Sequence, residues 1–144
     1  MPLTFNQVID FGYATFNAGK LTIMPAGLQT SAADLSTMGI TDVDFSKLLK
    51  LQFSFTLANN SISKLDLSTI KLFNADLDVT NNNLTTVTFG SANFAKTAKL
   101  LFAGNPALQV IDFGTTRNVP FLEISADMQS LTFAGIGKTR IEVM

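Results

Sequence analysis

Two residue types that carry much of side-chain chemistry are missing from this chain of 144 residues: it has no cysteine and no histidine. Without cysteine there is no disulfide framework and no thiol nucleophile. Without histidine the chain lacks the most common general base, pH switch and metal ligand. Hydroxyl groups remain, but they have no activating thiol or imidazole beside them. We therefore expect no enzyme activity, no cofactor and no metal site.

Charge is also scarce, since Asp, Glu, Lys and Arg make up 15% of the residues and the net charge is -1. Nucleic-acid binding needs a dense cationic surface, so nucleic acid is disfavoured as a partner, and nonspecific adhesion to acidic lipid is disfavoured on the same ground. No apolar run approaches the roughly 18 to 20 residues that span a bilayer. The first residues also lack the basic and apolar regions of a secretory signal. We expect no membrane insertion, and a protein that works where it is made or leaves by another route.

What the chain does contain is a repeat. Two apolar residues separated by one position recur at starting residues 11, 33, 55, 77, 100 and 122, so the step is 22 residues with a single step of 23. A fixed period of this size is typical of stacked repeats. The pairs are Phe11 and Tyr13, Ala33 and Leu35, Phe55 and Leu57, Leu77 and Val79, Leu100 and Phe102, and Leu122 and Ile124.

Each unit also has a second apolar pair with the same alternation. Alternating apolar and polar residues predict a half-buried strand, so each unit should hold two short strands. The second pairs are Leu21 and Ile23, Val43 and Phe45, Leu65 and Leu67, Val87 and Phe89, Ile111 and Phe113, and Leu131 and Phe133.

The position between the two pairs is Phe16, Met38, Asn60, Asn82, Asn105 and Asp127 in successive units. The unit Phe55-x-Leu57-x-x-Asn60-x-Ile62-x-x-Leu65-x-Leu67 has the form LxLxxNxLxxLxL, and so does the unit that follows it. This string resembles the leucine-rich repeat family. The resemblance covers about residues 11 to 143 and is strongest over 55 to 113.

The resemblance implies that Asn60, Asn82 and Asn105 turn inward as one column and bind the main chain of their own and neighbouring turns. An independent physical reason supports this, because a sharp bend exposes amides inside the coil and each buried unpaired amide costs about 1–3 kcal/mol. Phe16 and Met38 depart from the pattern, so the first two turns should close by apolar packing or backbone bonding.

The predicted fold is therefore mainly β, a right-handed leucine-rich-repeat-like solenoid of about six turns with short parallel strands and irregular connecting arms. We expect a single domain, 1–144, with an N-terminal cap over 1–10, six repeats over 11–140 and a C-terminal edge strand over 141–144. Residues 94–99 are the best candidate for a brief helix in an arm. One apolar residue in each arm should plug the outer side of the core: Leu28, Leu49, Ile70 or Leu72, Phe94, Val119 and Ile136.

Acidic residues mostly fall on the predicted strands, while most of the ten basic residues fall on the arms. Asp34, Asp44, Asp66 and Asp78 take outward positions, and stacking should bring Asp44 close to Asp66. Like charges directly opposed on neighbouring strands are destabilising. Either solvent screens a plain polar face, or a basic protein partner or a cation sits there.

The last residues form another surface of interest. Ile141 and Val143 look like the opening strand of a further turn. They either seal the sixth turn or dock on another subunit, since an unpaired strand edge invites pairing with another chain and would make a homo-oligomer possible.

Two function classes fit these observations. The first is a non-enzymatic structural and interaction protein, an accessory component of a larger assembly such as a virus particle, of the decoration or attachment type. The second, implied by the resemblance, is a leucine-rich-repeat recognition module that binds a protein or glycan ligand through its sheet face. Recognition faces usually offer exposed aromatic anchors, and the outward positions here are mainly Asp and Thr. We therefore favour the first class. The sequence leaves the location unknown, and a virion is one location that fits this class.

Overall fold

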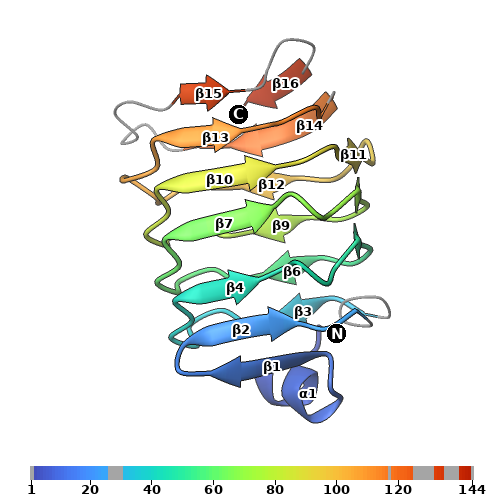
Figure 1. Ribbon diagram of the computed structural model, residues 1–144, viewed down its shortest axis with the longest axis vertical. Coiled ribbons are helices and arrows are strands. Elements are labelled where there is room, and N and C mark those ends of the chain that lie inside the picture. Colours follow the sequence, from blue (N-terminus) through green and yellow to red (C-terminus); the bar gives the residue numbers. More distant parts are fainter. Residues whose placement is uncertain (1, 26–30, 117, 125–131, 135–139, 144) are drawn as a thin grey trace.

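The computed structural model describes residues 2–25, 31–116, 118–124, 132–134 and 140–143. The chain is mainly β, and stacked parallel strands form a β-solenoid of about four turns (Figure 1). This confirms the predicted fold class. The predicted number of turns, about six, is too high, because a helix and an antiparallel hairpin replace the regular repeat at the N-terminal end.

A six-stranded sheet runs along one side of the solenoid. All of its pairings are parallel, and the register joins residues one repeat apart, such as Phe55 and Leu77. A bulge lies between Val119 and Leu122. The strands are β3 (Ala33–Asp34), β6 (Phe55–Thr56), β9 (Leu77–Asp78), β12 (Leu100–Leu101), β14 (Asn118–Glu123) and β16 (Arg140–Val143).

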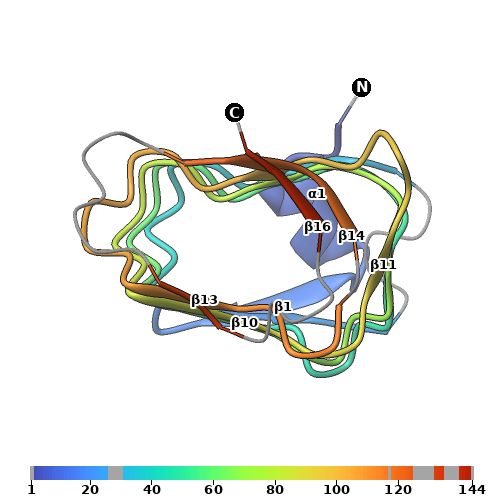
Figure 2. The same cartoon turned by 90° about the horizontal axis from the view of Figure 1, so that it is seen from above.

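The second strands lie on the opposite side of the core and belong to two sheets (Figure 2). One sheet has the order β1 (Ala14–Asn17), β2 (Lys20–Ile23) and β4 (Asp42–Asp44). The other joins β7 (Lys64–Leu67), β10 (Thr86–Phe89), β13 (Val110–Asp112) and β15 (Thr132–Ala134). All pairings are parallel except β1 with β2.

The connecting arms form a fourth sheet, which the repeat pattern did not predict. Its strands are β5 (Lys50–Leu51), β8 (Leu72–Phe73) and β11 (Asn93–Phe94). The helix predicted over 94–99 is wrong, because Phe94 belongs to a strand and its ring stacks on Phe73 at 4.6 Å between centroids. Once turns stack in a fixed register, equivalent arm residues lie one strand spacing apart, and backbone pairing overrides weak local helix propensity.

The N-terminal end is a cap rather than a repeat. Helix α1 (Phe5–Asp10) begins with a capping box between Thr4 and Gln7. The predicted strand pair Phe11 and Tyr13 is wrong, because Phe11 ends this helix and its side chain is 55% exposed. The following strands β1 and β2 form an antiparallel hairpin instead of a turn of the solenoid. Among the described residues, no helix is long and apolar enough to cross a membrane.

The inward side chains form one hydrophobic cluster that extends from Val8 to Leu122. Ile70 and Val119 plug the core from the arms as predicted. Leu49 does not, because its side chain is 61% exposed while the adjacent Leu48 is fully buried. Two further residues predicted to plug the core, Leu28 and Ile136, lie outside the described residues.

Candidate functional site

The three asparagines of the repeat lie inside the coil. Their exposed fractions are 8% for Asn60, 4% for Asn82 and 0% for Asn105. Each side-chain amide hydrogen-bonds to backbone groups of its own turn and of the preceding turn. These amides are committed to the main chain, so the column stabilises the fold and is not a ligand site.

Asn82 shows the arrangement in the central turn. Its Oδ1 accepts a hydrogen bond from the backbone N–H of Ile62 at 3.1 Å. Its Nδ2 donates to the carbonyl oxygens of Leu57 and Val79, both at 3.0 Å. Since Ile62 and Leu57 belong to the preceding turn, one side chain joins two turns.

The first two departures from the asparagine pattern have different explanations. Met38 is 42% exposed, and its backbone N–H donates to Oδ1 of Asn60 at 2.9 Å, so the next turn closes this corner. The side chain of Met38 lies outside the core, so it does not fill the corner in place of the asparagine. Phe16 is not at a corner at all, because it lies in β1 with its ring 5.2 Å from that of Phe5.

The outward aspartates on the strands have a structural role that the sequence analysis missed. In each case Oδ1 accepts the backbone N–H of the residue two positions later, which caps the turn at the end of the strand, as Asp side chains commonly do. The recurring Asp-x-Ser and Asp-x-Thr triplets were the available signal. The pairs are Asp34 with Ser36, Asp44 with Ser46, Asp66 with Ser68, Asp78 with Thr80 and Asp112 with Gly114.

Most of these aspartates are separated from one another by a neutral residue. In the six-stranded sheet, Thr56 stands between Asp34 and Asp78. In the four-stranded sheet, Thr88 stands between Asp66 and Asp112. Alternation of this kind avoids the repulsion of like charges directly opposed on adjacent strands.

The exception is the boundary between β4 and β7. Continuing the repeat register would place Asp44 opposite Asp66, but β4 and β7 belong to different sheets and do not pair as a ladder. The two strands still lie in contact. The ladder is therefore interrupted at the one point on this side where two carboxylates would face each other, and the predicted stacking of these aspartates is only partly realised.

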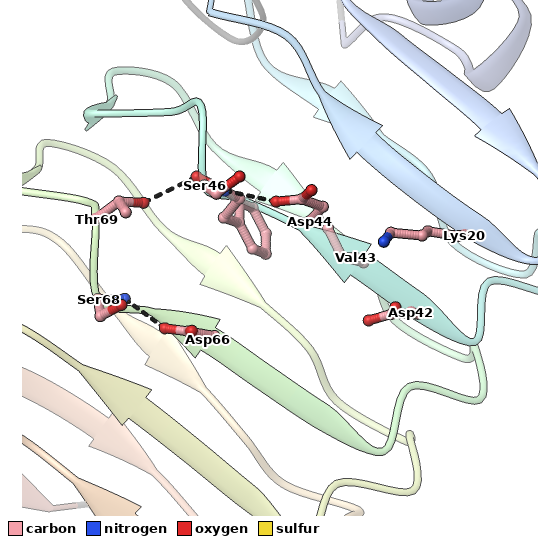
Figure 3. Close-up of a pocket in the computed structure, with 9 residues that line it drawn as sticks. Lys20, Asp42, Val43, Asp44, Ser46, Asp66, Ser68 and Thr69 are labelled. Carbon is pink, nitrogen blue, oxygen red and sulfur yellow. Dashed lines mark hydrogen bonds between the residues drawn. The ribbon is translucent and has the colours of Figure 1, made fainter.

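A small open pocket of about 210 Å³ lies at this boundary (Figure 3). Lys20, on β2, sits opposite Asp42 in the register and contributes the positive charge. Sequence analysis did not single out this lysine. The lining residues are Lys20, Asp42, Val43, Asp44, Phe45, Ser46, Asp66, Ser68 and Thr69.

Hydrogen bonding sets the acidity of the capping carboxylates. The side chain and then the backbone N–H of Ser46 lower the pKa of Asp44, and Lys20 and Lys47 lower this pKa further. The side chain and backbone of Ser36 lower the pKa of Asp34 in the same way. A carboxyl group with a lowered pKa is ionised at neutral pH and is a poor proton donor. The pocket therefore holds the ionised carboxylate of Asp44 beside Lys20.

The remaining sequence candidates lie elsewhere. Strand β16, which contains Ile141 and Val143, is the outermost strand of the six-stranded sheet and pairs with β14. Asp34 and Asp78 lie in that same sheet, away from the pocket. Across the described residues, no three acidic side chains gather as a metal site.

Comparison of the chain with protein-family models, with curated proteins and with solved structures finds no match. The resemblance to leucine-rich repeats thus stands on the motif residues themselves.

Proposed function

We propose that the protein is a non-enzymatic structural and interaction protein, and that it joins a larger protein assembly of which a virus particle is one example. The observation that carries this proposal is the difference between the two ends of the solenoid. One end is covered by a helix and a hairpin, while the other, as far as the structure describes it, ends in the outermost strands of two sheets (Figure 1).

At the covered end, α1 packs across the first turns. Val8 of this helix is buried, and Leu3 and Phe5 pack against the core. Leu3 also forms a parallel bridge with Ala33 at the start of the six-stranded sheet. Burial of Val8 removes apolar surface from water at this end, although Phe11 at the end of the helix stays 55% exposed.

At the other end, β16 and β15 are the last strands of their sheets within the described part of the chain. Each has a pairing neighbour on one side only, β14 and β13 respectively. The free side of such a strand offers backbone N–H and C=O groups to a further strand. We propose that a protein partner in the assembly contributes this strand.

The test is a proline at the edge. Val143→Pro removes a backbone donor from β16, so docking on particles of the producing organism should be lost. Thr15→Lys changes an exposed residue at the covered end and should leave docking unchanged. Melting of both variants shows whether the solenoid remains folded. Docking of a folded Val143→Pro variant at the parent level would contradict the proposal.

A further inference from the structure

The side of the solenoid formed by the arms is cationic. We use the name arm face for the surface formed by the exposed lysines of the arms and two exposed apolar side chains. The exposed fractions of these two are 61% for Leu49 and 39% for Phe53. Residues 46–54, 68–75 and 90–98 contain no Asp or Glu, and Asp76, which follows the second of these segments, accepts the backbone N–H of Lys99 just before β12. The lysines of the arm face are Lys47, Lys50, Lys71 and Lys96.

The adjoining side, formed by the six-stranded sheet, is acidic. We call acidic face the outward residues Asp34, Asp78 and Glu123. Strands β3, β6, β9, β12 and β14 contain no Lys or Arg, and the one described lysine beside them is Lys99, whose Nζ lies 5.3 Å from the centre of the Phe121 ring in β14. The half-buried Leu101 lies between Asp78 and Glu123 in the register and adds an apolar patch. The net charge of -1 therefore conceals two faces of opposite sign.

Both faces repeat at the same pitch because they belong to the same stack of turns. Strands of a sheet lie about 4.8 Å apart. On the acidic face, Asp34 and Asp78 are two strands apart, with Thr56 between them. On the arm face, Lys50 lies in β5, Lys71 precedes β8 and Lys96 follows β11, so positive charges recur over the same turns.

We propose that the arm face of one copy of this protein docks side by side on the acidic face of a second copy. This inference rests on the proposed function and names one partner within the assembly, a second copy of the chain. Charge complementarity favours a second copy, because both matching surfaces and their shared pitch are present in one molecule. Leu49 and Phe53 would meet the apolar patch at Leu101.

The geometry of this contact has a consequence for the assembly. The two faces are different surfaces, so the contact is heterologous, and a docked pair still presents one free arm face and one free acidic face. A standard interface takes about 800 Å² from each partner, roughly a ninth of the 7194 Å² surface of the chain. One long side of the solenoid can supply that area, and rows of copies should form.

The strength of the contact should depend strongly on salt. Exposed ion pairs contribute at most about 1 kcal/mol each. Salt reduces the range of charge interactions from about 30 Å at 0.01 M to about 3 Å at 1 M. We expect concentration-dependent association in dilute buffer, measured by sedimentation velocity, and monomers in concentrated salt.

Charge reversal tests the pairing of the two faces. Lys71→Glu on the arm face and Glu123→Lys on the acidic face should each weaken association about tenfold, because like charges then oppose each other. The chain carrying both changes regains complementarity and should recover most of the association. Lys64→Glu makes the same charge change on β7, outside both faces, and serves as the matched control.

Several results would overturn the proposal. Equal weakening by Lys64→Glu and Lys71→Glu would show an effect of net charge alone. Failure of the double variant to recover, with melting unchanged, would show that the two faces do not meet. Unchanged self-association of Lys71→Glu together with lost binding to phosphatidylserine vesicles would assign the arm face to lipid. The Val143→Pro test measures docking on particles, whereas the charge-reversal tests measure self-association. Either proposal can therefore fail while the other holds.

Discussion

Asp44 and Asp66 occupy the same position in successive turns, and the ladder between their strands is the one that does not form. Each carboxylate accepts a hydrogen bond from the turn that follows its own strand. Oδ1 of Asp44 accepts the backbone N–H of Ser46 at 2.8 Å, and Oδ1 of Asp66 accepts that of Ser68 at 3.0 Å. The repeat thus keeps its turn caps at both positions, and the backbone pairing is given up where the charges would be opposed.

The charge of Asp44 should stabilise the protein at neutral pH. Its pKa is lowered in the folded state, first by the side chain and backbone of Ser46 and then by Lys20 and Lys47, so the carboxylate favours folding above the unfolded pKa of about 3.9. Asp44→Asn keeps an oxygen acceptor but loses the charge. We expect a loss of at most about 1 kcal/mol at pH 7, because surface charges are screened.

This difference between Asp44→Asn and the parent should shrink as the pH falls through the folded pKa of Asp44 and should vanish once the carboxyl group is protonated. Urea melts at pH 7 and at acidic pH measure it. Asp10→Asn, at an exposed position in α1, removes the same charge away from Ser46 and should not lower stability. A gap between Asp44→Asn and the parent that stays constant with pH would refute the electrostatic explanation.

Asn82 should matter far more than its neighbour. Asn82→Ala leaves the Ile62 N–H and two carbonyl groups without their buried partner, so the free energy of unfolding should fall by about 1–3 kcal/mol. Asn83 is exposed, and Asn83→Ala should change stability little. Denaturant unfolding of both variants measures the two changes in stability. Equal small changes would show that the asparagine column does not stabilise the stacking of the turns.

Thr37 is a site where the parent sequence is suboptimal. Its φ is 60°, a left-handed conformation that a β-branched residue rarely adopts, whereas Asn59 and Asn81 fill the equivalent positions at 58° and 56°. Thr37→Asn should therefore raise the free energy of unfolding by about 1 kcal/mol. The reverse change, Asn59→Thr, should lower it by a similar amount, and thermal melts of the two variants should shift in opposite directions.

Gly90 should not tolerate a side chain. A Cβ atom there would overlap the carbonyl oxygen of Ser68 in the turn below, which is backbone and cannot swing aside. Gly90→Ala should cost about 1–3 kcal/mol, as overpacking does in protein cores. The adjacent exposed Ser91 is the control, since Ser91→Ala adds no atom to this contact. An unchanged melting temperature in Gly90→Ala would mean that the turns can separate locally.

The fold class was predictable from the sequence because a strict period constrains every turn at once. The alternation around Leu65 and Val87, for example, predicts strands that pair in register. The N-terminal cap was not predictable from periodicity, because Phe11 and Tyr13 match the apolar pattern while Thr4 and Gln7 supply helix-capping chemistry just before them. The capping interactions of Thr4 and Gln7 favour a helix here, where the apolar pattern alone predicted a strand.

The arm sheet and the pocket were missed for different reasons. Residues such as Leu72 and Asn93 have no shared propensity, and their pairing arises only from the stacking of neighbouring turns. The pocket depends on an interrupted ladder, and the sequence shows only that Asp44 and Asp66 are equivalent. Whether β4 and β7 pair and bring the two carboxylates together, or stay unpaired, depends on the backbone conformation, which the residue pattern does not specify.

The asparagine column also gives the solenoid a direction of construction. Asn60 completes the corner at Ile40, and Asn82 completes the corner at Ile62, so each turn is finished by the turn made after it. During synthesis, the newest turn should stay open until the next asparagine emerges from the ribosome. A cut that removes residues from Asn82 onward should likewise loosen the turn before the cut, since the Ile62 amide loses its acceptor inside the coil.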